Sequence, residues 1–387
     1  MQFLYFFRNK LIIHVFSIFE PMSETRHNWT KEEVLAIYNK PLMELLYEAA
    51  SVHRMNHDPN TVQVSTLLSI KTGGCSEDCG YCPQAARYHT DIEGNDLMTV
   101  NQVKAQALRA KESGSSRVCM GAAWRNVKDG PEFDQVLEMV RTINKLDMEV
   151  CCTLGMVTEN QAKRLAEAGL YAYNHNLDTS EEYYKEVIST RGFEDRLQTI
   201  ENVRKTNVTV CSGGIIGMGE AVEDRAGMLV ALSTLNPQPE SVPINALVAV
   251  EGTPMEDEKP VEIWEMIRMV ATTRIVMPNT QVRLSAGRTQ MSREGQAMCF
   301  FAGANSIFAG DKLLTTPNPD VNEDMAMFKT LGLKTQQPFE KHPQSKSVEA
   351  NDSQFVALGE KPKWSRPGHH IERNEAAKLK AKEIASK

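Results

Sequence analysis

Short runs of apolar, β-branched residues alternate along this chain with longer segments in which apolar residues recur every three or four positions. The short runs predict strands and the longer segments predict helices. This alternation favours repeated β-α units and therefore a parallel sheet. Eight strands are expected, at Thr66–Lys71, Arg117–Ala122, Glu149–Leu154, Ala172–Leu177, Val208–Ile216, Ser241–Val248, Gln281–Ser285 and Asn305–Phe308.

Three helix starts carry the capping-box pattern, in which a Thr is followed three residues later by Glu or Gln. The pairs are Thr30 with Glu33, Thr158 with Gln161, and Thr179 with Glu182. Gly169 is expected to end the second of these helices, because a glycine tolerates the left-handed conformation found just past a helix end.

The number and spacing of the strands predict a closed barrel. Eight β-α units in about 260 residues match the usual size of a (β/α)8 barrel. A doubly wound open sheet is the alternative, but it favours fewer strands and a glycine-rich turn after the first one. A cysteine-rich loop occupies that place here. The predicted fold is therefore an α/β TIM-type barrel over residues 29–335, with an N-terminal helical extension at 1–28 and a C-terminal tail at 336–387.

The two ends of the chain differ from the barrel in composition. Residues 3–19 are apolar but are interrupted by Arg8, Lys10 and His14, so neither apolar run reaches the roughly 20 residues that span a bilayer. No small-residue cleavage site follows, which argues against a secretory signal. We interpret residues 1–21 as a non-native or upstream-start extension, with an organelle or membrane address as the alternative. The tail is polar and rich in Pro and Lys, and it is expected to be disordered up to a short charged helix at Glu372–Ser386.

Charge and cysteine usage limit the function. The net charge is −7 and no long basic stripe occurs, so nucleic acid is not an expected partner. Eight cysteines in 387 residues do not suggest a disulfide scaffold. Their clustering beside glycines indicates metal binding in a reducing compartment, and we expect a cytoplasmic protein that does not bind a membrane.

Cys75, Cys79 and Cys82 form a C-x3-C-x2-C pattern directly after the first predicted strand. Three thiolates this close can hold three irons of a [4Fe–4S] cluster and leave the fourth iron open to a small molecule. Zinc fingers use paired C-x2-C units, and no second pair follows. Three unrelated structural cysteines are the alternative. With Tyr81 before the last cysteine, the pattern resembles the signature of the radical S-adenosylmethionine (SAM) enzymes.

Three further cysteines, Cys119, Cys151 and Cys211, lie on three different predicted strands. Alternate side chains of barrel strands converge on the interior, although isolated cysteines in apolar strands are usually small core residues. Arg283 on the seventh strand would need an anion if buried. Three thiolates overcompensate the charge of a diferric [2Fe–2S] core by one unit, which one guanidinium can neutralise. Period-two alternation places only one of Cys151 and Cys152 inside, without deciding which.

Seven strings between residues 66 and 319 carry a more specific resemblance. They are GGCSEDCGYCPQ (73–84), CMGAAW (119–124), YNHNLDTS (173–180), CSGGIIGMGE (211–220), SVPIN (241–245), VRLSAGR (282–288) and LLTTPNP (313–319). Together they resemble the biotin synthase family. The resemblance implies a [4Fe–4S] cluster on Cys75, Cys79 and Cys82 that chelates SAM. It also implies a [2Fe–2S] cluster on Cys119, Cys151, Cys211 and Arg283, and so selects Cys151 over Cys152.

Polar residues near the strand ends are candidates for ligand contacts. Asn174, Asn176 and Asp178 alternate with period two and should point the same way from the fourth strand. Asp178 suits a ribose diol, and Asn176 with Asn245 suits the edges of a cyclic urea. A polar strand mouth facing solvent is the alternative. His175 should point the other way and is expected to be structural.

The resemblance extends these candidates to two sets. The SAM contacts it implies are Tyr81, Asp178, Gly213, Ile215, Gly217 and Glu220. The substrate contacts it implies are Asn174, Asn176, Asn245, Thr315 and Thr316. Thr315 and Thr316 would hold a carboxylate, although ordinary turn chemistry also explains them.

The implied reaction is radical insertion of sulfur into dethiobiotin, the last step of biotin biosynthesis. The [4Fe–4S] cluster would cleave SAM to a 5′-deoxyadenosyl radical and the [2Fe–2S] cluster would donate sulfur, so no side chain is assigned as general acid or base. An electron donor such as flavodoxin or ferredoxin, and a homodimer, are also implied. The alternatives are another radical SAM sulfurtransferase and a non-catalytic iron–sulfur electron carrier.

Overall fold

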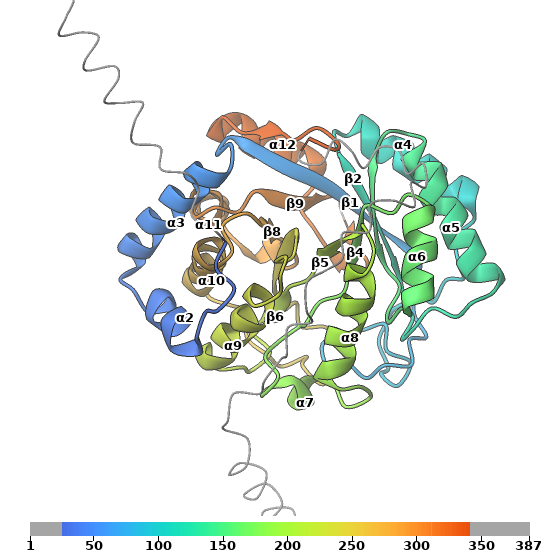
Figure 1. Ribbon diagram of the computed structural model, residues 1–387, viewed down its shortest axis with the longest axis horizontal. Coiled ribbons are helices and arrows are strands. Elements are labelled where there is room, and N and C mark those ends of the chain that lie inside the picture. Colours follow the sequence, from blue (N-terminus) through green and yellow to red (C-terminus); the bar gives the residue numbers. More distant parts are fainter. Residues whose placement is uncertain (1–24, 311, 341–387) are drawn as a thin grey trace, which may run out of the picture. The chain divides into compact units, whose positions relative to one another are not determined.

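A closed barrel of eight parallel strands forms the centre of the computed structural model, which describes residues 25–310 and 312–340 (Figure 1). The strands pair in the order β1-β2-β3-β4-β5-β7-β8-β9, and β9 pairs with β1 to close the barrel. Their bounds are Thr61–Lys71 (β1), Arg117–Ala122 (β2), Glu149–Thr153 (β3), Ala172–Asn174 (β4), Thr209–Cys211 (β5), Ser241–Ala246 (β7), Gln281–Leu284 (β8) and Ser306–Ala309 (β9). The predicted TIM-type fold is confirmed.

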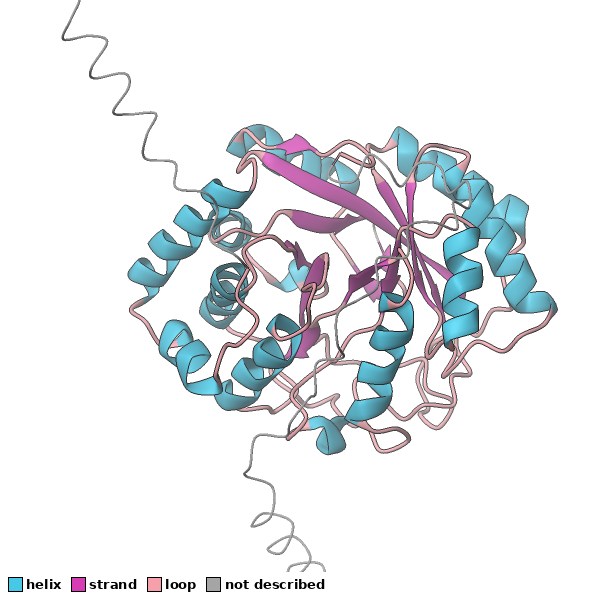
Figure 2. Cartoon of the chain, in the orientation of Figure 1, coloured by secondary structure: helices cyan, strands magenta, loops and turns pink. Residues whose placement is uncertain are grey.

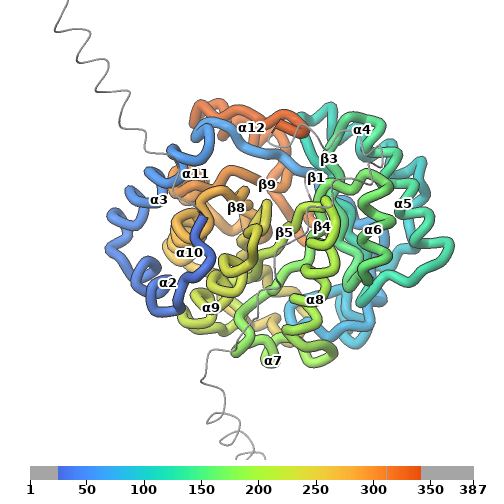
Figure 3. Tube along the Cα trace, viewed as in Figure 1, coloured from blue at the N-terminus to red at the C-terminus, as the bar shows by residue number. Residues whose placement is uncertain are grey.

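Helices cover the outside of the barrel (Figure 2). They are α2 (Lys31–Tyr38), α3 (Leu42–Asn56), α4 (Val100–Glu112), α5 (Pro131–Asn144), α6 (Glu159–Glu167), α7 (Tyr184–Val187), α8 (Phe193–Arg204), α9 (Val222–Ser233), α10 (Ile263–Val276), α11 (Arg293–Phe301) and α12 (Val321–Leu331). A 3₁₀ turn, η1, spans Arg288–Gln290. The tube in Figure 3 follows the strands around the barrel in chain order, until the orange β9 lies beside the blue β1. Of the described helices, none is long and apolar enough to cross a membrane.

The observed strands differ from the predicted ones at particular points. β1 begins at Thr61 rather than Thr66, because its first residues pair with β12 (Lys334–Thr335) and then with β9. The single strand predicted at 208–216 is split into β5 and β6 (Gly214–Ile216). A Cβ on Gly213, in the break, would lie 2.0 Å from the carbonyl oxygen of Pro243. The break therefore brings the backbone closer to β7 than any other residue type allows.

Two of the three predicted capping boxes are present, at Thr30 with Glu33 and at Thr158 with Gln161. Gly169, with φ +92°, follows the end of α6 as expected. The third box was wrong: the next helix, α7, begins only at Tyr184. The local acceptor there is the Ser180 hydroxyl, which accepts the backbone N–H of Tyr183 at 3.1 Å. Serine and threonine compete for such turns, and the neighbouring Ser180 takes the role predicted for Thr179.

The buried apolar residues form two separate clusters. The larger lies between the strands and the surrounding helices. The smaller lies inside the barrel and consists of Cys119, Cys151, Tyr171, Ala172, Cys211, Phe308, Leu313 and Phe339. A TIM-barrel interior is usually filled by layers of bulky branched side chains. Here three cysteines and an alanine stand in the inner cluster, and we call the space around them the chamber.

The two ends of the chain are described only in part. Residues 1–21 and the predicted helix at 372–386 lie outside the described residues. The first five residues of the predicted tail, 336–340, lie against the barrel, where the backbone N–H of Gln336 donates to the Val62 carbonyl at 2.8 Å. A two-stranded hairpin of β10 (Lys312–Leu313) and β11 (Thr316–Pro317) follows β9 at the opposite end of the barrel.

Candidate cofactor and substrate site

A cavity of about 320 Å³ opens at the C-terminal ends of the barrel strands. Its wall includes Cys75 and Cys82 from the loop after β1, and Cys119, Cys151 and Arg283 from barrel strands. Both predicted metal-binding groups therefore border the same space. In (β/α)8 barrels this end of the strands carries the active site.

The loop that follows β1 holds Cys75, Cys79 and Cys82. Its conformation is fixed by its own backbone: Cys75 N–H donates to the Gln84 carbonyl at 3.0 Å, and Cys82 N–H donates to the Cys79 carbonyl at 2.9 Å. Gly80 N–H donates to the carbonyl of Val187 at 2.9 Å. A Cβ on Gly80 would lie 3.3 Å from Met255. The three cysteines thus project from a loop that is tied to the last residue of α7.

Asp78, between the first two cysteines, anchors this loop. Its carboxylate accepts the backbone N–H groups of Ser189 at 2.9 Å and Thr190 at 3.0 Å. Burial raises the pKa of Asp78, but the hydrogen bonds from Ser189 and Thr190 outweigh it and lower the pKa to about 2. Arg87 adds an ion pair at 3.0 Å. A carboxylate that accepts several backbone N–H groups in this way is firmly held in its charged form.

The three loop thiols resist ionisation in the absence of a cation. Burial raises the pKa of Cys75, that of Cys79 to about 11 and that of Cys82 to about 12. The neighbouring Cys79 and Cys75 contribute to the shift of Cys82, so the three thiols lie close enough to repel one another as thiolates. Bound iron supplies the positive charge that such a group needs. Among the described residues no three His, Cys, Asp or Glu side chains are placed to share a single metal ion. Ligands of a polynuclear cluster bind separate irons and need not converge.

The three strand cysteines meet inside the chamber. Cys119 on β2 is the register partner of Cys151 on β3, and Cys151 is the partner of Ala172 on β4. Cys211 lies on the next strand, β5, where it pairs with Asn174. The small side chain of Ala172 leaves room between the second and third thiols. Cys152 belongs to the larger cluster outside the barrel, so the structure places Cys151 inside.

Hydrogen bonds join the three strand thiols. The Cys151 thiol lies between the other two, and its hydrogen bonds lower the pKa of Cys119 and lower that of Cys211 to about 6. The pKa of Cys151 is raised, because the Cys119 and Cys211 sulfurs both favour its protonated form. The Cys211 thiol therefore ionises most readily, the Cys119 thiol more readily than an ordinary cysteine, and the Cys151 thiol keeps its proton between them. This is a donor set suited to a cation with more than one positive charge.

Arg283 lies at one side of the thiols. Its Nη1 is 3.8 Å from Cys211 Sγ. Its guanidinium carbon lies over the Phe308 ring, 4.6 Å from the ring centroid. Its Nε donates to Ser306 Oγ at 2.9 Å and its Nη2 to Gln63 Oε1 at 2.9 Å. No carboxylate bonds this buried guanidinium directly in the described structure, so an anion in the chamber would supply the missing partner.

The three polar residues predicted on the fourth strand all border the cavity, but β4 ends at Asn174, so Asn176 and Asp178 lie in the loop beyond the strand. The Nδ2 group of Asn174 donates to Asn176 Oδ1 and to Cys211 Sγ, each at 3.2 Å. Asn176 Oδ1 also accepts the Gly213 N–H at 3.2 Å. Asn245 borders the same cavity and donates to the Gly214 carbonyl at 2.9 Å. The amides are therefore held in one orientation by the barrel backbone.

Asp178 lies one turn beyond β4 with φ +69°. Its Oδ2 accepts the Tyr81 hydroxyl at 2.9 Å and forms a short ion pair with the Nη2 group of Arg196. Asp178 and Arg196 are both buried. Desolvation opposes the charge of Arg196, yet Asp178 raises its pKa above the usual value. Burial, and next the charge of Asp178, raise the pKa of Tyr81, so its hydroxyl remains a donor.

The four residues of the glycine-rich run are placed differently from one another. Ile215 borders the cavity. Gly217, with φ +93°, and Glu220 belong to the following turn, where both Glu220 oxygens accept the Gly217 N–H, at 2.9 and 3.0 Å. Arg225 pairs with Glu220 at 2.7 Å. Gly213 lies in the break between β5 and β6. In the described structure Gly213, Gly217 and Glu220 shape the turn, and only Ile215 among the four borders the cavity.

Thr315 and Thr316 lie in the β10–β11 hairpin and border the cavity. The Thr316 hydroxyl donates to the Leu313 carbonyl at 3.2 Å, which is ordinary turn chemistry. Leu314 has φ +51°, and a Cβ on Gly121 would lie 2.9 Å from its Cδ2 atom. The Leu314 side chain therefore lies directly over Gly121 of β2, in space that a larger residue at 121 would share.

Two buried arginines of the site were not predicted. Arg191 and Arg196 follow α7 and border the cavity beside Asp178. Arg191 is 3.7 Å from Glu77, and its Nε and Nη1 groups have no hydrogen-bond partner in the described structure. Two arginines five residues apart, just after a string of predicted ligand residues, are the signal that could have identified them. His175 also borders the cavity, and burial lowers its pKa well below the usual value.

Two family matches cover most of the barrel. Residues 69–231 match the Radical SAM superfamily, and residues 243–334 match the Biotin and Thiamin Synthesis associated domain. Residues 232–242 separate the two matches, and the second match begins within β7. The first match contains all six predicted cysteine ligands, and the second contains Arg283, Thr315 and Thr316.

Relatives of known name match over nearly the whole chain. The chain is 87% identical over 358 residues to the biotin synthase of Flavobacterium johnsoniae, which covers 92% of this chain and 99% of that protein. It is 59% identical over 309 residues to the mitochondrial biotin synthase of Arabidopsis thaliana, covering 80% of this chain and 82% of that protein.

Solved structures share the fold at low identity. HydG, a maturase of the [FeFe]-hydrogenase, matches with a TM-score of 0.71 at 16% identity, over 83% of this chain and 75% of its own. Methylornithine synthase (PylB) matches with a TM-score of 0.67 at 17% identity, over 80% and 94% of the two chains. At such identities the likeness concerns the fold alone.

Proposed function

This chain belongs to the biotin synthase family, and we propose that it carries out sulfur insertion with two iron–sulfur clusters that border one cavity. It is a radical SAM enzyme of biotin synthesis. The substrate proposed is dethiobiotin. The rival interpretation as a non-catalytic electron carrier does not agree with the family to which the chain belongs.

The observation that carries the proposal is the meeting of Cys119, Cys151 and Cys211 inside the barrel whose mouth holds the C-x3-C-x2-C loop. Cys119 and Cys151 border the same cavity as Cys75 and Cys82. Three cysteines that converge on one chamber, beside a buried arginine, are better suited to a second cluster than to ordinary core packing. A ligand in this cavity would contact both groups.

The chemistry of the donor sets fits two clusters. Cys75, Cys79 and Cys82 would hold the [4Fe–4S] cluster, and Cys119, Cys151, Cys211 and Arg283 would hold the [2Fe–2S] cluster. When bound, the first supplies the electron that cleaves SAM to methionine and a 5′-deoxyadenosyl radical, and the second supplies the sulfur. Arg283 offers a positive charge in a buried chamber, where it stabilises a cluster with net negative charge.

The residues around Asp178 would bind SAM. The Asp178 carboxylate, held by Tyr81 and Arg196, retains an oxygen to accept hydrogen bonds from a ribose diol. Arg191 borders the cavity, and its Nε and Nη1 groups have no hydrogen-bond partner in the described structure beyond the 3.7 Å ion pair of Nε with Glu77. A buried guanidinium of this kind suits a carboxylate, which SAM provides. Gly213, Gly217 and Glu220 would shape the backbone turn, and Ile215, which borders the cavity, would contact the adenosine.

The amide side chains that border the cavity would bind the substrate. Asn174, Asn176 and Asn245 present fixed donors and acceptors to the cavity, as a cyclic urea requires. Thr315 and Thr316 in the hairpin would hold the substrate carboxylate. The residues orient the reactants and exclude water, and none is assigned as general acid or base. His175, with its lowered pKa, stays neutral.

Flavodoxin or ferredoxin as electron donor, a homodimer and a cytoplasmic location belong to the same proposal.

Adjacent cysteines provide a matched test. We propose to reconstitute Cys151→Ser and Cys152→Ser proteins anaerobically and to measure iron, sulfide and Mössbauer spectra. Cys151→Ser should lose the [2Fe–2S] signal and keep the [4Fe–4S] signal. Cys152→Ser should keep both, because Cys152 is equally buried on the same strand but lies in the outer core.

The outcomes separate the alternatives. Wild-type protein with a [4Fe–4S] signal alone would make Cys119, Cys151 and Cys211 core residues and would end the assignment of dethiobiotin. Equal loss in the two serine variants would show that the effect is one of folding rather than ligation. Conversion of dethiobiotin to biotin by the wild-type protein with SAM and a reductant completes the test.

A further inference from the structure

The end of the barrel opposite the cavity mouth is closed by residues 336–340, which we call the floor segment. The segment follows β12, which pairs with the first residues of β1. Its start is held by Gln336, whose Oε1 accepts the Gln281 Nε2 group at 3.0 Å within the barrel. Of the five side chains in the segment, those of Gln336 and Phe339 are buried.

Phe339 extends from this segment into the chamber. It is 3% exposed and belongs to the inner cluster together with the three strand cysteines. Its ring meets the edge of Tyr171, with centroids 6.0 Å apart at an interplanar angle of 66°. No other described residue after α12 joins that cluster. The aromatic side chain therefore fills the space below the thiols that branched side chains fill in other barrels.

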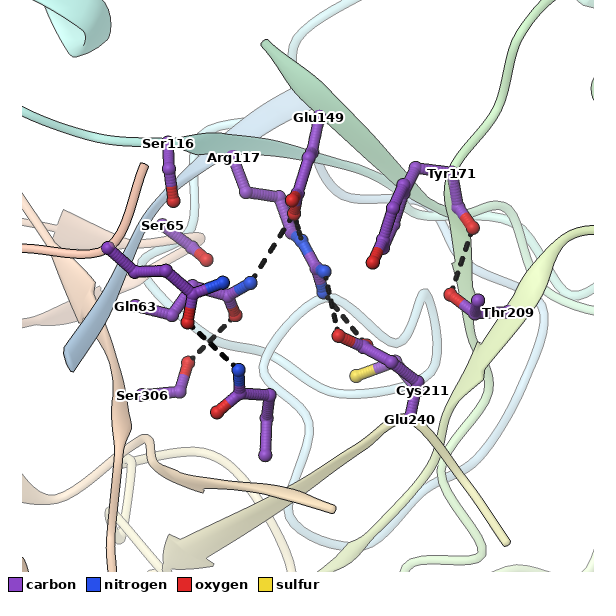
Figure 4. Close-up of polar contacts among 12 residues, drawn as sticks. Gln63, Ser65, Ser116, Arg117, Glu149, Tyr171, Thr209, Cys211, Glu240 and Ser306 are labelled. Carbon is purple, nitrogen blue, oxygen red and sulfur yellow. Dashed lines mark hydrogen bonds and ion pairs between the residues drawn. The ribbon is translucent and has the colours of Figure 1, made fainter. Parts of the chain in front are cut away.

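The backbone of Phe339 is held by a buried polar network. Its N–H donates to Glu149 Oε1 at 2.8 Å, and Glu149 Oε2 accepts Arg117 Nε at 2.8 Å. Figure 4 shows Glu149 between Arg117 and Gln63, with Glu240 on the far side of Arg117. Gln63 donates to Glu149 at 3.3 Å and accepts from Arg283, so the network extends from the floor segment to the chamber.

The conformation of Phe339 is costly in itself. Its φ of +59° lies in the left-handed region, which a phenylalanine rarely adopts. A residue stays there only when its surroundings over-determine it. The Glu149 hydrogen bond fixes the backbone, and the inner cluster takes the ring. A glycine would relieve the backbone but would leave the space that the aromatic ring fills empty.

We propose that the floor segment seals the chamber from solvent, and that Phe339 keeps water and small solutes from reaching the Cys211 sulfur from this end of the barrel. Cys211 is fully buried and, unlike Cys119 and Cys151, does not border the cavity that opens at the mouth. Protection of a cluster by the floor segment rests on the proposed function. Protection of the Cys211 thiol in metal-free protein does not, so this proposal and the proposed function can fail independently.

The test is the alkylation of each cysteine in the full-length, metal-free protein. Native protein is treated with iodoacetamide, and labelling of every cysteine is followed by peptide mass spectrometry. Phe339→Ala should raise the labelling rate of Cys211 at least about tenfold, because loss of a buried ring opens the local structure. Gln337→Ala, an exposed neighbour in the same segment, should leave the rate unchanged.

The other cysteines serve as internal controls. Cys152 and Cys299 are fully buried outside the chamber, and their rates should not change in Phe339→Ala. Phe339→Leu should return the Cys211 rate to near the wild-type value, because an apolar side chain again fills the floor. An unchanged Cys211 rate in Phe339→Ala would overturn the proposal. So would equal acceleration of Cys152 and Cys299, which indicates general loss of stability, or a leucine variant as reactive as the alanine variant.

Discussion

Substitution of Asp178 should have two separable effects, one on stability and one on SAM affinity. Asp178 and Arg196 are 2% and 6% exposed at their side chains. Asp178→Ala leaves the Arg196 guanidinium buried with only the Tyr184 hydroxyl, at 2.8 Å from Nε, as a neutral partner. Removing one member of a buried ion pair costs about 3–5 kcal/mol, which corresponds to a fall in Tm of roughly 5–8 °C for a domain of this size.

The double variant isolates the ion pair. Arg196→Met alone leaves the Asp178 carboxylate buried beside Cys79 and should also destabilise the protein. In Asp178→Ala with Arg196→Met neither charge remains, so the loss should be smaller than the sum of the single losses by about 2 kcal/mol or more. The cycle is measured by denaturant unfolding of the metal-free protein, because bound clusters violate two-state behaviour.

SAM affinity is measured by titration calorimetry on the reconstituted protein. A ribose diol that donates to a carboxylate contributes about 1.5–3 kcal/mol, so Asp178→Ala should raise the Kd roughly ten- to a hundredfold. Iron and sulfide content should stay at the wild-type level. Asp324→Ala provides the control, because Asp324 forms an equally buried pair with Arg288 away from the cavity. It should destabilise the protein and leave the Kd unchanged. A wild-type Kd in Asp178→Ala would remove Asp178 from the SAM site, and strictly additive stability losses would refute the ion-pair argument.

Two further substitutions test the two clusters. Arg283→Ala should lower [2Fe–2S] content less than Cys151→Ser does, because thiolates supply most of the ligation; equal loss in Mössbauer spectra would contradict this. Asp78→Ala leaves the N–H groups of Ser189 and Thr190 without their acceptor, at a cost of about 2–3 kcal/mol. It should therefore lower [4Fe–4S] content selectively, which iron and sulfide analysis with electron paramagnetic resonance of the reduced protein can establish.

The barrel and its cysteines could be predicted because their signals are local. Each strand and each helix is indicated by a periodic pattern within its own short segment, and the order of these segments indicates the fold. The C-x3-C-x2-C spacing lies within a single loop. Cys151 and Cys152 could not be separated in this way. The choice depends on the register of β3 against β2 and β4, where Cys151 faces Cys119 and Ala172. Register is a property of the assembled sheet, and a shift of one residue would exchange the two cysteines.

The residues that were not predicted are those defined by distant partners. Arg191 and Arg196 stand in a loop and a helix without any periodic pattern, and their importance follows from burial beside Glu77 and Asp178. Phe339 is a single aromatic residue in a polar stretch, where composition predicted only a tail. Glu149, which holds it, comes from a strand 190 positions earlier in the chain. Contacts of such separation cannot be read from a local pattern.

Backbone strain shows how a hollow barrel is kept closed. In the described residues four non-glycine residues have positive φ, namely Asp147, Asp178, Leu314 and Phe339. Three of them border the cavity or the chamber: Asp178 on its wall, Leu314 in the hairpin at the mouth and Phe339 at the floor. Each left-handed residue costs about 1–2 kcal/mol. Glycine would remove that cost but would also remove the carboxylate or the apolar side chain. If the chamber is to hold a cluster, large side chains from the barrel strands cannot fill it. The side chains that close it must then come from loops, even where the loop backbone is strained.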